Sequence, residues 1–169
     1  TASNRKGLGD KVEEFDNGNL NAENKNVIVI GGGDTAMDCV RTAVRQNAKS
    51  VKCLYRRDKE NMPGSAREVH NAEEEGVEFI WLSNPKKYIG TEKILSILVE
   101  KMKLGEPDSS GRKKPEPISN SEFEMKADMA INALGFDPEN LPKLFNDQNL
   151  LVSKLGTIKI NYQTMETNT

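Results

Sequence analysis

The chain has 169 residues and a formal net charge of −2, with 36% hydrophobic and 30% charged residues. This composition suits a globular domain with its own core and is unlike that of a disordered chain. The small net charge, and the lack of any apolar run near the roughly 20 residues of a membrane span, give no reason to expect nucleic acid or membrane as a partner. No secretory signal opens the sequence, so we expect a cytoplasmic protein.

Few side chains in the sequence are suited to catalysis or metal binding. Cys39 and Cys53 form no C-x-x-C pair, which disfavours a redox dithiol or an iron–sulfur cluster within this sequence. The single histidine, His70, excludes a histidine-cluster metal site. No acid–base pair or nucleophile triad is evident either. We therefore predict no catalytic residue and no metal site, which is typical of hydride transfer between cofactors that the protein only positions.

The two ends of the sequence are polar. Residues 1–24 are rich in Gly, Asn, Asp and Lys without a hydrophobic period, and we interpret them as a leader or linker. The sequence starts without methionine and ends in a polar run at Thr169, so we expect a piece of a larger protein.

The first half of the remaining sequence predicts alternating strands and helices. Residues 27–30 form a continuous apolar run, as expected for a strand buried on both faces. The next residues, to about Asn47, have apolar side chains at helical spacing, and residues 51–55 predict a second parallel strand. Residues 65–68 have the form of a capping box that starts a helix ending at Gly76. With a third strand at 77–82, the order is one mononucleotide-binding half of a doubly wound fold.

The second half predicts strands that short loops join, and hence antiparallel pairing. An apolar strand at 128–133 should return to the parallel sheet beside residues 27–30, and the tail offers two short strands. The predicted fold class is α/β, a Rossmann-like three-layer domain with a parallel sheet plus an antiparallel β-meander, over residues 25–135. Residues 136–169 are predicted to lead back to an absent FAD domain. The antiparallel strands are expected at 86–89, 94–104 and 122–126, the tail strands at 150–152 and 157–160, and a surface loop at 105–117.

The glycine turn after the first strand predicts a pyrophosphate site. Gly31 permits the tight turn, Gly33 lets phosphates approach the backbone, and Ala36 supplies the small residue that strand–helix packing needs. The N-terminus of the following helix offers unpaired N–H groups and the positive end of its dipole. Asp34 or Thr35 is expected to cap that helix. The alternative is a glycine-rich turn without a ligand, and the strand, helix and strand around it favour the dinucleotide.

The end of the second strand indicates which dinucleotide binds. NAD enzymes place a carboxylate there for the ribose 2′-hydroxyl, whereas this sequence has Arg56 and Arg57. Guanidinium groups bind a 2′-phosphate in a bidentate fork, so we predict NADPH over NADH. Asp58 and Lys59 beside them leave open a merely solvated surface. Arg67 is either a third positive charge for the site or simply exposed.

Longer motifs resemble the small (β) subunit family of NADPH-dependent glutamate synthase. The matching stretches are GGGDTAMDC at 31–39, YRRD at 55–58, NMPGS at 61–65, REV at 67–69, EEEGVEF at 73–79, LGEPD at 104–108, GR at 111–112, PEPI at 115–118 and ALGF at 133–136. The resemblance covers most of residues 26–136 and extends into loops that a generic nucleotide fold does not share.

This resemblance implies that NADPH bound here gives a hydride to FAD, and that electrons pass through 4Fe-4S clusters to a large subunit that makes glutamate. The implied partners are the FAD domain of the same full-length chain and the glutamate synthase large subunit. The family's cysteine-rich region, FAD fingerprint and closing FAD segment are not in this sequence, so we expect no turnover by this chain alone. The predicted cofactor-binding residues are Gly31, Gly32, Gly33, Asp34, Thr35, Ala36, Arg56, Arg57, Arg67, Ala133 and Gly135.

Three other interpretations stay open on the sequence alone. In the first, the chain is a non-catalytic NADPH-binding or interaction module. In the second, it is the same module from another NADPH-dependent iron–sulfur flavoprotein. A methyltransferase shares the glycine loop, but it prefers an acidic residue where Arg56 stands.

Overall fold

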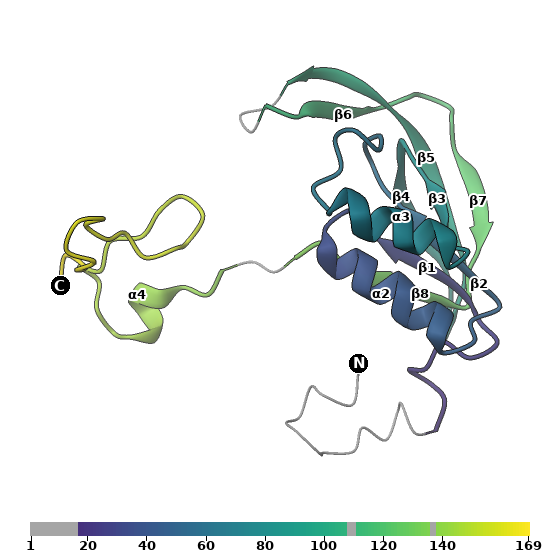
Figure 1. Cartoon of the computed structure of the whole chain (residues 1–169), viewed down its shortest axis with the longest axis horizontal. Helices are drawn as coiled ribbons and strands as arrows, with labels where there is room; N and C mark the ends of the chain where they lie inside the picture. Colours follow the sequence, from purple (N-terminus) through teal and green to yellow (C-terminus); the bar gives the residue numbers. More distant parts are fainter. Residues whose placement is uncertain (1–16, 108–110, 136–137) are drawn as a thin grey trace. The chain divides into compact units, whose positions relative to one another are not determined.

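The computed structural model describes residues 17–107, 111–135 and 138–169. The chain divides after Leu134 into two compact units, Thr1–Leu134 and Gly135–Thr169 (Figure 1). The leader at 1–24 and the boundary at 135 stay predictions about the domains of the protein, and residues 1–16 lie outside the described residues.

A parallel sheet forms the centre of the first unit, in the order β3-β2-β1-β8. All three strand pairs are parallel, and Ile30 at the end of β1 lies opposite Leu54 at the end of β2. The return of the last strand to the side of the first confirms that prediction. The strands are β1 (Asn26–Ile30), β2 (Ser50–Leu54), β3 (Glu78–Ile80) and β8 (Met129–Asn132).

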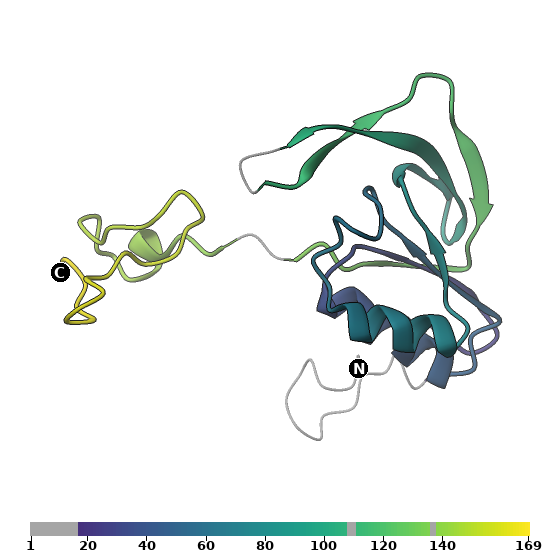
Figure 2. The ribbon, with the colours of Figure 1, turned by 45° about the horizontal axis from the view of Figure 1, so that its top comes forward.

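Two helices and a second sheet cover the two faces of the parallel sheet (Figures 1 and 2). Because side chains alternate along a strand, Val27 and Val29 pack with the helices, while Ile28 and Ile30 pack against the antiparallel sheet. Two hydrophobic clusters result, and the three-layer α/β prediction is confirmed. The covering elements are α2 (Asp34–Arg45), α3 (Ala66–Glu74), β4 (Ser83–Gly90), β5 (Ile94–Pro107), β6 (Lys113–Pro117) and β7 (Phe123–Lys126).

The prediction of a surface loop at 105–117 is wrong for residues 105–107 and 113–117, which lie in strands, and residues 108–110 lie outside the described residues. Strand β5 continues to Pro107, and β6 pairs with it in antiparallel register from Lys113 to Pro117. Pro115 and Pro117 lie two residues apart, so both lack an N–H on the same edge of β6. The other edge keeps its donors for β5, and proline is tolerated on such an edge strand.

The predicted caps of both helices are also wrong. Gly33 is the N-cap of α2 without a side-chain cap, and Ser65 begins α3 without one. Glu68, the expected capping-box partner of Ser65, pairs instead with Arg41 of α2. Arg41 Nε also donates to Glu75 Oε1 at 2.8 Å, so one guanidinium joins α2 to α3. These two carboxylates raise the pKa of Arg41.

The third predicted strand, at 77–82, is shorter in the structure because β3 ends at Ile80. Leu82 has a φ of +51°, which turns the chain from the parallel sheet into β4. The prediction that the preceding helix ends at Gly76 is confirmed, since α3 stops at Glu74 and Gly76 has a φ of +90°.

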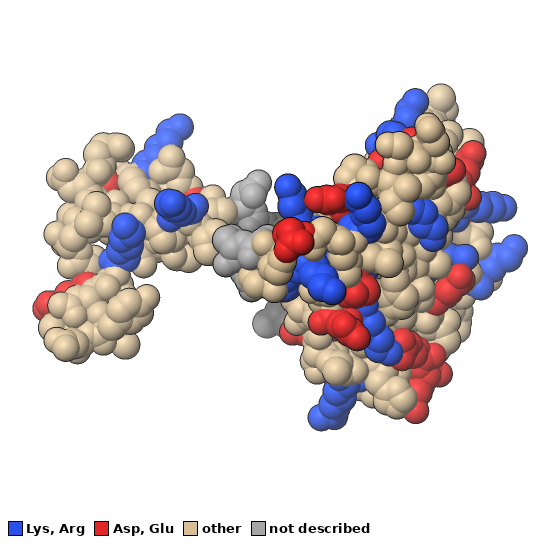
Figure 3. All heavy atoms as spheres, turned by 90° about the horizontal axis from the view of Figure 1, so that it is seen from above, with Lys and Arg blue, Asp and Glu red and all other residues tan. Residues whose placement is uncertain are grey.

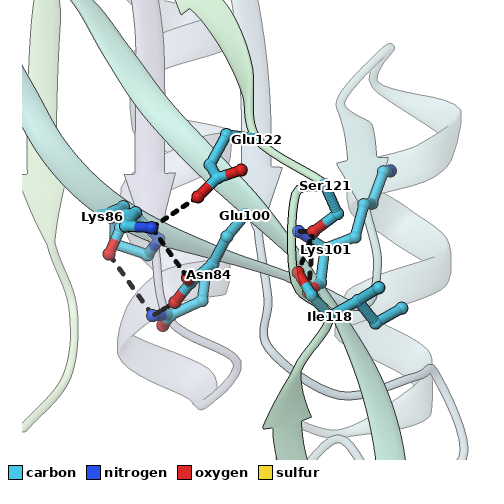
Figure 4. A network of polar contacts seen from close by, with 8 residues as sticks. Asn84, Lys86, Glu100, Lys101, Ile118, Ser121 and Glu122 are labelled. Atoms are coloured by element: carbon cyan, nitrogen blue, oxygen red, sulfur yellow. Dashed lines mark hydrogen bonds and ion pairs between the residues drawn. The ribbon is translucent and has the colours of Figure 1, made fainter.

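Polar contacts tie the strands of the antiparallel sheet together on its exposed face (Figure 4). Lys86 Nζ contacts Glu122 and lies 3.9 Å from Glu100 Oε2. The hydrogen bond from Lys86 holds the pKa of Glu122 below its usual range. In the connection between β6 and β7, Ser121 Oγ accepts from Lys101 N of β5 at 3.0 Å and donates to Ile118 O at 2.6 Å.

The second unit contains little regular structure. Helix α4 (Leu141–Leu144) begins at Asn140, whose side chain accepts from Lys143 N at 3.2 Å. The two predicted tail strands are present only as a single antiparallel bridge between Val152 and Ile158.

The charged surface of the first unit shows no single-sign face in the view of Figure 3, where basic and acidic side chains are interspersed. Within the described residues, no helix has the length and apolar character needed to cross a membrane, and no cluster of metal-binding side chains occurs.

Candidate functional site

Most of the predicted site residues gather where β1 and β2 end. Because the two strands are parallel and in register, the turn after Ile30 and the residues after Leu54 lie at the same edge of the sheet. Gly31–Gly33 follow β1, and Tyr55 and Arg56 follow β2. This edge is the place where doubly wound folds bind ligands.

Gly31 is held against the end of β8. Its φ is +142°, and a Cβ at this position would lie 2.3 Å from the carbonyl oxygen of Ala133. Gly31 N donates to Leu54 O at 3.1 Å, and Ala133 N donates to Ile30 O at 2.7 Å. Gly31 and Ala133, two of the predicted residues, therefore meet through packing of the backbone.

Gly32 and Gly33 face different surroundings. A Cβ on Gly32 would lie 2.4 Å from the ring of Tyr55, so that ring occupies the space beside Gly32. A Cβ on Gly33 would meet no atom within 4 Å, and the φ of −94° at Gly33 is open to any residue. Gly33 is therefore the glycine of the turn that faces open space.

The start of α2 bonds to the loop before α3. Asp34 is exposed, and its Oδ1 accepts from Ser65 N at 3.0 Å instead of capping α2. Gly64 N donates to Gly32 O at 2.9 Å, so the loop closes on the glycine turn. Thr35 is exposed at the first turn of α2, and Ala36 is fully buried against β1 as a small packing residue.

The two adjacent arginines differ in their exposure. Arg56 is exposed, and its side chain makes no hydrogen bond or ion pair within the part of the chain that the structure describes. The side chain of Arg57 is buried, and its Nε donates to Lys113 O of β6 at 2.7 Å. Arg67 is exposed in the first turn of α3, just after the loop that bonds to the glycine turn.

The buried thiol beneath the glycine turn is inert. Cys53 Sγ lies 3.4 Å from Gly31 O and donates to it. Burial raises the pKa of Cys53 to about 12, so the thiol stays protonated at neutral pH. Cys39 is half-buried, and neither cysteine forms a disulfide within the residues that the structure describes.

The glycine turn and the start of α2 are suited to binding a pyrophosphate. Gly33 O accepts from Ala36 N and Met37 N, whereas Asp34 N and Thr35 N have no acceptor among the described residues. These donors stand at the positive end of a 12-residue helix. Open space in front of Gly33 and an exposed guanidinium at Arg56 fit a dinucleotide with a 2′-phosphate.

Some features of the site were not predicted. The roles of Tyr55 beside Gly32 and of Asn61, whose Oδ1 accepts from Lys113 N at 3.2 Å, depend on contacts that the local sequence does not encode. Gly135 lies in the second unit, with a φ of +88°. An open hollow in that unit, lined by Glu139, Asn140, Lys143 and Leu144, contains none of the predicted residues.

Comparison with known proteins decides the family. The model of the pyridine nucleotide-disulphide oxidoreductase family matches residues 2–169. The chain belongs to this family. Solved structures of oxidoreductases share its fold: the structure of T. acidophilum thioredoxin reductase superposes with a TM-score of 0.68 at 15% identity, over 92% of this chain and 44% of that one. FprA of Mycobacterium tuberculosis, solved in complex with NADPH, gives a TM-score of 0.60 at 14% identity, over 72% and 41%.

Within the oxidoreductase family, several of the similar proteins are glutamate synthase small chains. The chain is 57% identical to a putative glutamate synthase [NADPH] small chain of Cereibacter sphaeroides, over 99% of this chain and 40% of the relative. It is 54% identical to the glutamate synthase [NADPH] small chain of Azospirillum brasilense, over 99% and 35%. The chain thus spans well under half the length of these relatives.

Proposed function

We propose that this chain is the NADPH-binding domain of a glutamate synthase small subunit, an oxidoreductase subunit that passes hydride from NADPH to FAD. The main support for this proposal is the sheet edge at which β1 and β2 both end, because the open glycine turn and the exposed Arg56 both lie there. The 54–57% identity to glutamate synthase small chains over nearly the whole chain supports the proposal.

Each residue at this edge has a distinct task in the proposal. The free N–H groups of Asp34 and Thr35 bind the pyrophosphate at the start of α2. Gly33 leaves room for the phosphates to approach the backbone, and Ala36 keeps α2 close to the sheet. The guanidinium of Arg56 binds the 2′-phosphate. Arg67 adds positive charge from the first turn of α3.

The reaction chemistry belongs to the cofactors. NADPH supplies the hydride, and this chain binds and orients the dinucleotide without a proton-transferring side chain. In the whole protein we propose FAD as the acceptor, bound by the FAD domain of the same full-length chain. Iron–sulfur clusters and the glutamate synthase large subunit are the proposed onward path to glutamate formation, in the cytoplasm.

Titration of NADPH and NADH against the 169-residue chain tests the proposal. Arg56→Ala should weaken NADPH binding roughly tenfold or more, because a charge-assisted phosphate contact is lost, and should leave NADH binding unchanged. Arg45→Ala is the matched control: Arg45 is an exposed arginine at the other end of α2, roughly 15 Å along the helix, and should change neither affinity. Equal affinity of the unaltered chain for NADH and NADPH would refute the proposed cofactor.

One alternative assignment has support of its own. The putative oxidoreductase AegA of Escherichia coli is 48% identical over 82% of this chain, and the NADPH-Fe(3+) oxidoreductase subunit beta of Geobacter sulfurreducens is 38% identical over 93%. The same module thus occurs in proteins with other names. The higher identity to the glutamate synthase small chains favours the first assignment.

A further inference from the structure

Arg57 differs from Arg56 in what it can reach. Only 3% of Arg57 is exposed, whereas Arg56 is exposed. Its Nε donates to Lys113 O at 2.7 Å, and its own carbonyl oxygen accepts from Leu82 N at 3.0 Å. Arg57 therefore joins the residues after β2 to the start of β6 and to the β3–β4 junction.

A second contact reaches the same residue of β6. Asn61 Oδ1 accepts from Lys113 N at 3.2 Å, so both backbone groups of Lys113 bind residues of the loop that follows β2. Backbone groups alternate between the two edges of a strand, which places Lys113 on the same edge as Pro115 and Pro117. Both prolines lack an N–H, so the backbone N–H of Lys113 is the donor on this edge of β6, and Asn61 Oδ1 accepts from it.

The loop after β2 is fixed internally as well. Asp58 Oδ1 accepts from Asn61 N at 3.0 Å and from Asn61 Nδ2 at 2.6 Å, so this carboxylate caps its own turn. Tyr55 Oη donates to Asn61 O at 3.0 Å, and the Tyr55 ring lies beside Gly32. A continuous set of contacts thus links β6 through the loop to the glycine turn.

We infer that Arg57 is a positioning residue: together with Asn61 it clamps Lys113 of β6 and so holds the loop in which Arg56 meets the 2′-phosphate. This inference rests on the proposed NADPH function. A loop that is already ordered loses less conformational entropy when the 2′-phosphate binds. This raises the affinity for NADPH but not for NADH, which has no 2′-phosphate. The two arginines then have different roles: Arg56 contacts the cofactor, and Arg57 holds the loop that positions Arg56.

The test measures the dissociation constants of NADH and NADPH and takes their ratio, which a general loss of stability does not change. Arg57→Ala and Asn61→Ala should each lower this preference for NADPH by roughly five- to tenfold, about the size of one ordinary hydrogen bond. Lys113→Ala is the matched control, because it keeps both backbone groups and should leave the ratio unchanged. In an Arg56→Ala background, Arg57→Ala should cause no further loss, since Arg57 acts through Arg56.

Amide hydrogen exchange at Lys113, without nucleotide, gives a second readout. Exchange there should be faster in Arg57→Ala and Asn61→Ala and unchanged in Lys113→Ala. Additive losses of preference in the double variant would show that Arg57 touches the phosphate itself, and unchanged exchange would show that no clamp exists. Either result overturns the inference while the proposed function stands, whereas an unaltered chain without preference for NADPH refutes the proposed function instead.

Discussion

Replacing each of the three glycines after β1 by alanine should have a different effect on stability and on NADPH binding. Gly31→Ala would place a Cβ 2.3 Å from Ala133 O at a φ of +142°, and should lower the free energy of unfolding by about 3 kcal/mol or more. Gly33→Ala places its methyl in open space at an N-cap, and should cost less than about 1 kcal/mol. The same methyl should weaken NADPH binding roughly tenfold, because phosphates approach there.

Chemical denaturation and NADPH titration of the two glycine variants measure these opposite effects. Gly32→Ala is an informative companion, since the ring of Tyr55 lies 2.4 Å from its Cβ position and stability should fall. A Gly33→Ala protein that is stable and binds NADPH as tightly as the unaltered chain would contradict the pyrophosphate site.

The sequence predicted the glycine turn because its signals are local: a short apolar run, three glycines and an apolar stripe at helical spacing. The burial of Arg57 was not predictable in this way. Its partner Lys113 lies 56 positions along the chain, in a strand that was itself missed. The alternation after β2 was the available signal, since Tyr55 is buried, Arg56 exposed and Arg57 buried.

At the scale of elements, one carboxylate joins the starts of the parallel strands. Asp128 Oδ2 accepts from Asn26 N at 2.8 Å and from Asn26 Nδ2 at 2.6 Å, and Ser50 Oγ donates to Asn26 Oδ1 at 2.8 Å. These contacts link β8, β1 and β2. The hydrogen bonds from Asn26 hold the pKa of Asp128 below its usual range.

Asp128→Asn should therefore destabilise the protein in a pH-dependent way. A carboxylate with a lowered folded-state pKa contributes stability above its unfolded pKa, about 3.9, and loses it as pH falls through the folded value. The variant should be less stable by up to about 1 kcal/mol at pH 7, a small figure because the carboxylate is exposed and screened. Urea denaturation at pH 7 and below pH 4 measures the difference, which should shrink in acid. A constant difference would contradict this account.

The strand β6 shows why one element was missed. Its sequence, KKPEP, resembles a loop because proline weakens most strands. The prolines at 115 and 117 are compatible with pairing because both fall on the edge of β6 away from β5. The failed caps have a similar cause, since Asp34 and Glu68 bond to Ser65 N and Arg41, which the local capping rules do not consider.

At the scale of the whole molecule, the order of the layers was predictable from the sequence. Alternating β and α patterns predict a parallel sheet, and consecutive short-loop strands predict a second, antiparallel one. Both hydrophobic clusters consist of residues before Leu134, with Ala133 in the cluster beneath the helices. The first unit therefore holds the interior that the sequence predicted.

This distribution predicts the effect of shortening the chain at two places. A chain ending at Leu134 keeps both clusters, the glycine turn and Arg56, so it should unfold cooperatively and bind NADPH more tightly than NADH. A chain ending at Lys126 lacks β8 and the Ala133 contact with Gly31, which leaves one edge of β1 unpaired and removes Ala130, Ile131 and Ala133 from the two clusters, so it should show no cooperative transition. Circular dichroism during heating distinguishes the two chains. Loss of the transition already at Leu134 would mean that the second unit is needed for the fold of the first.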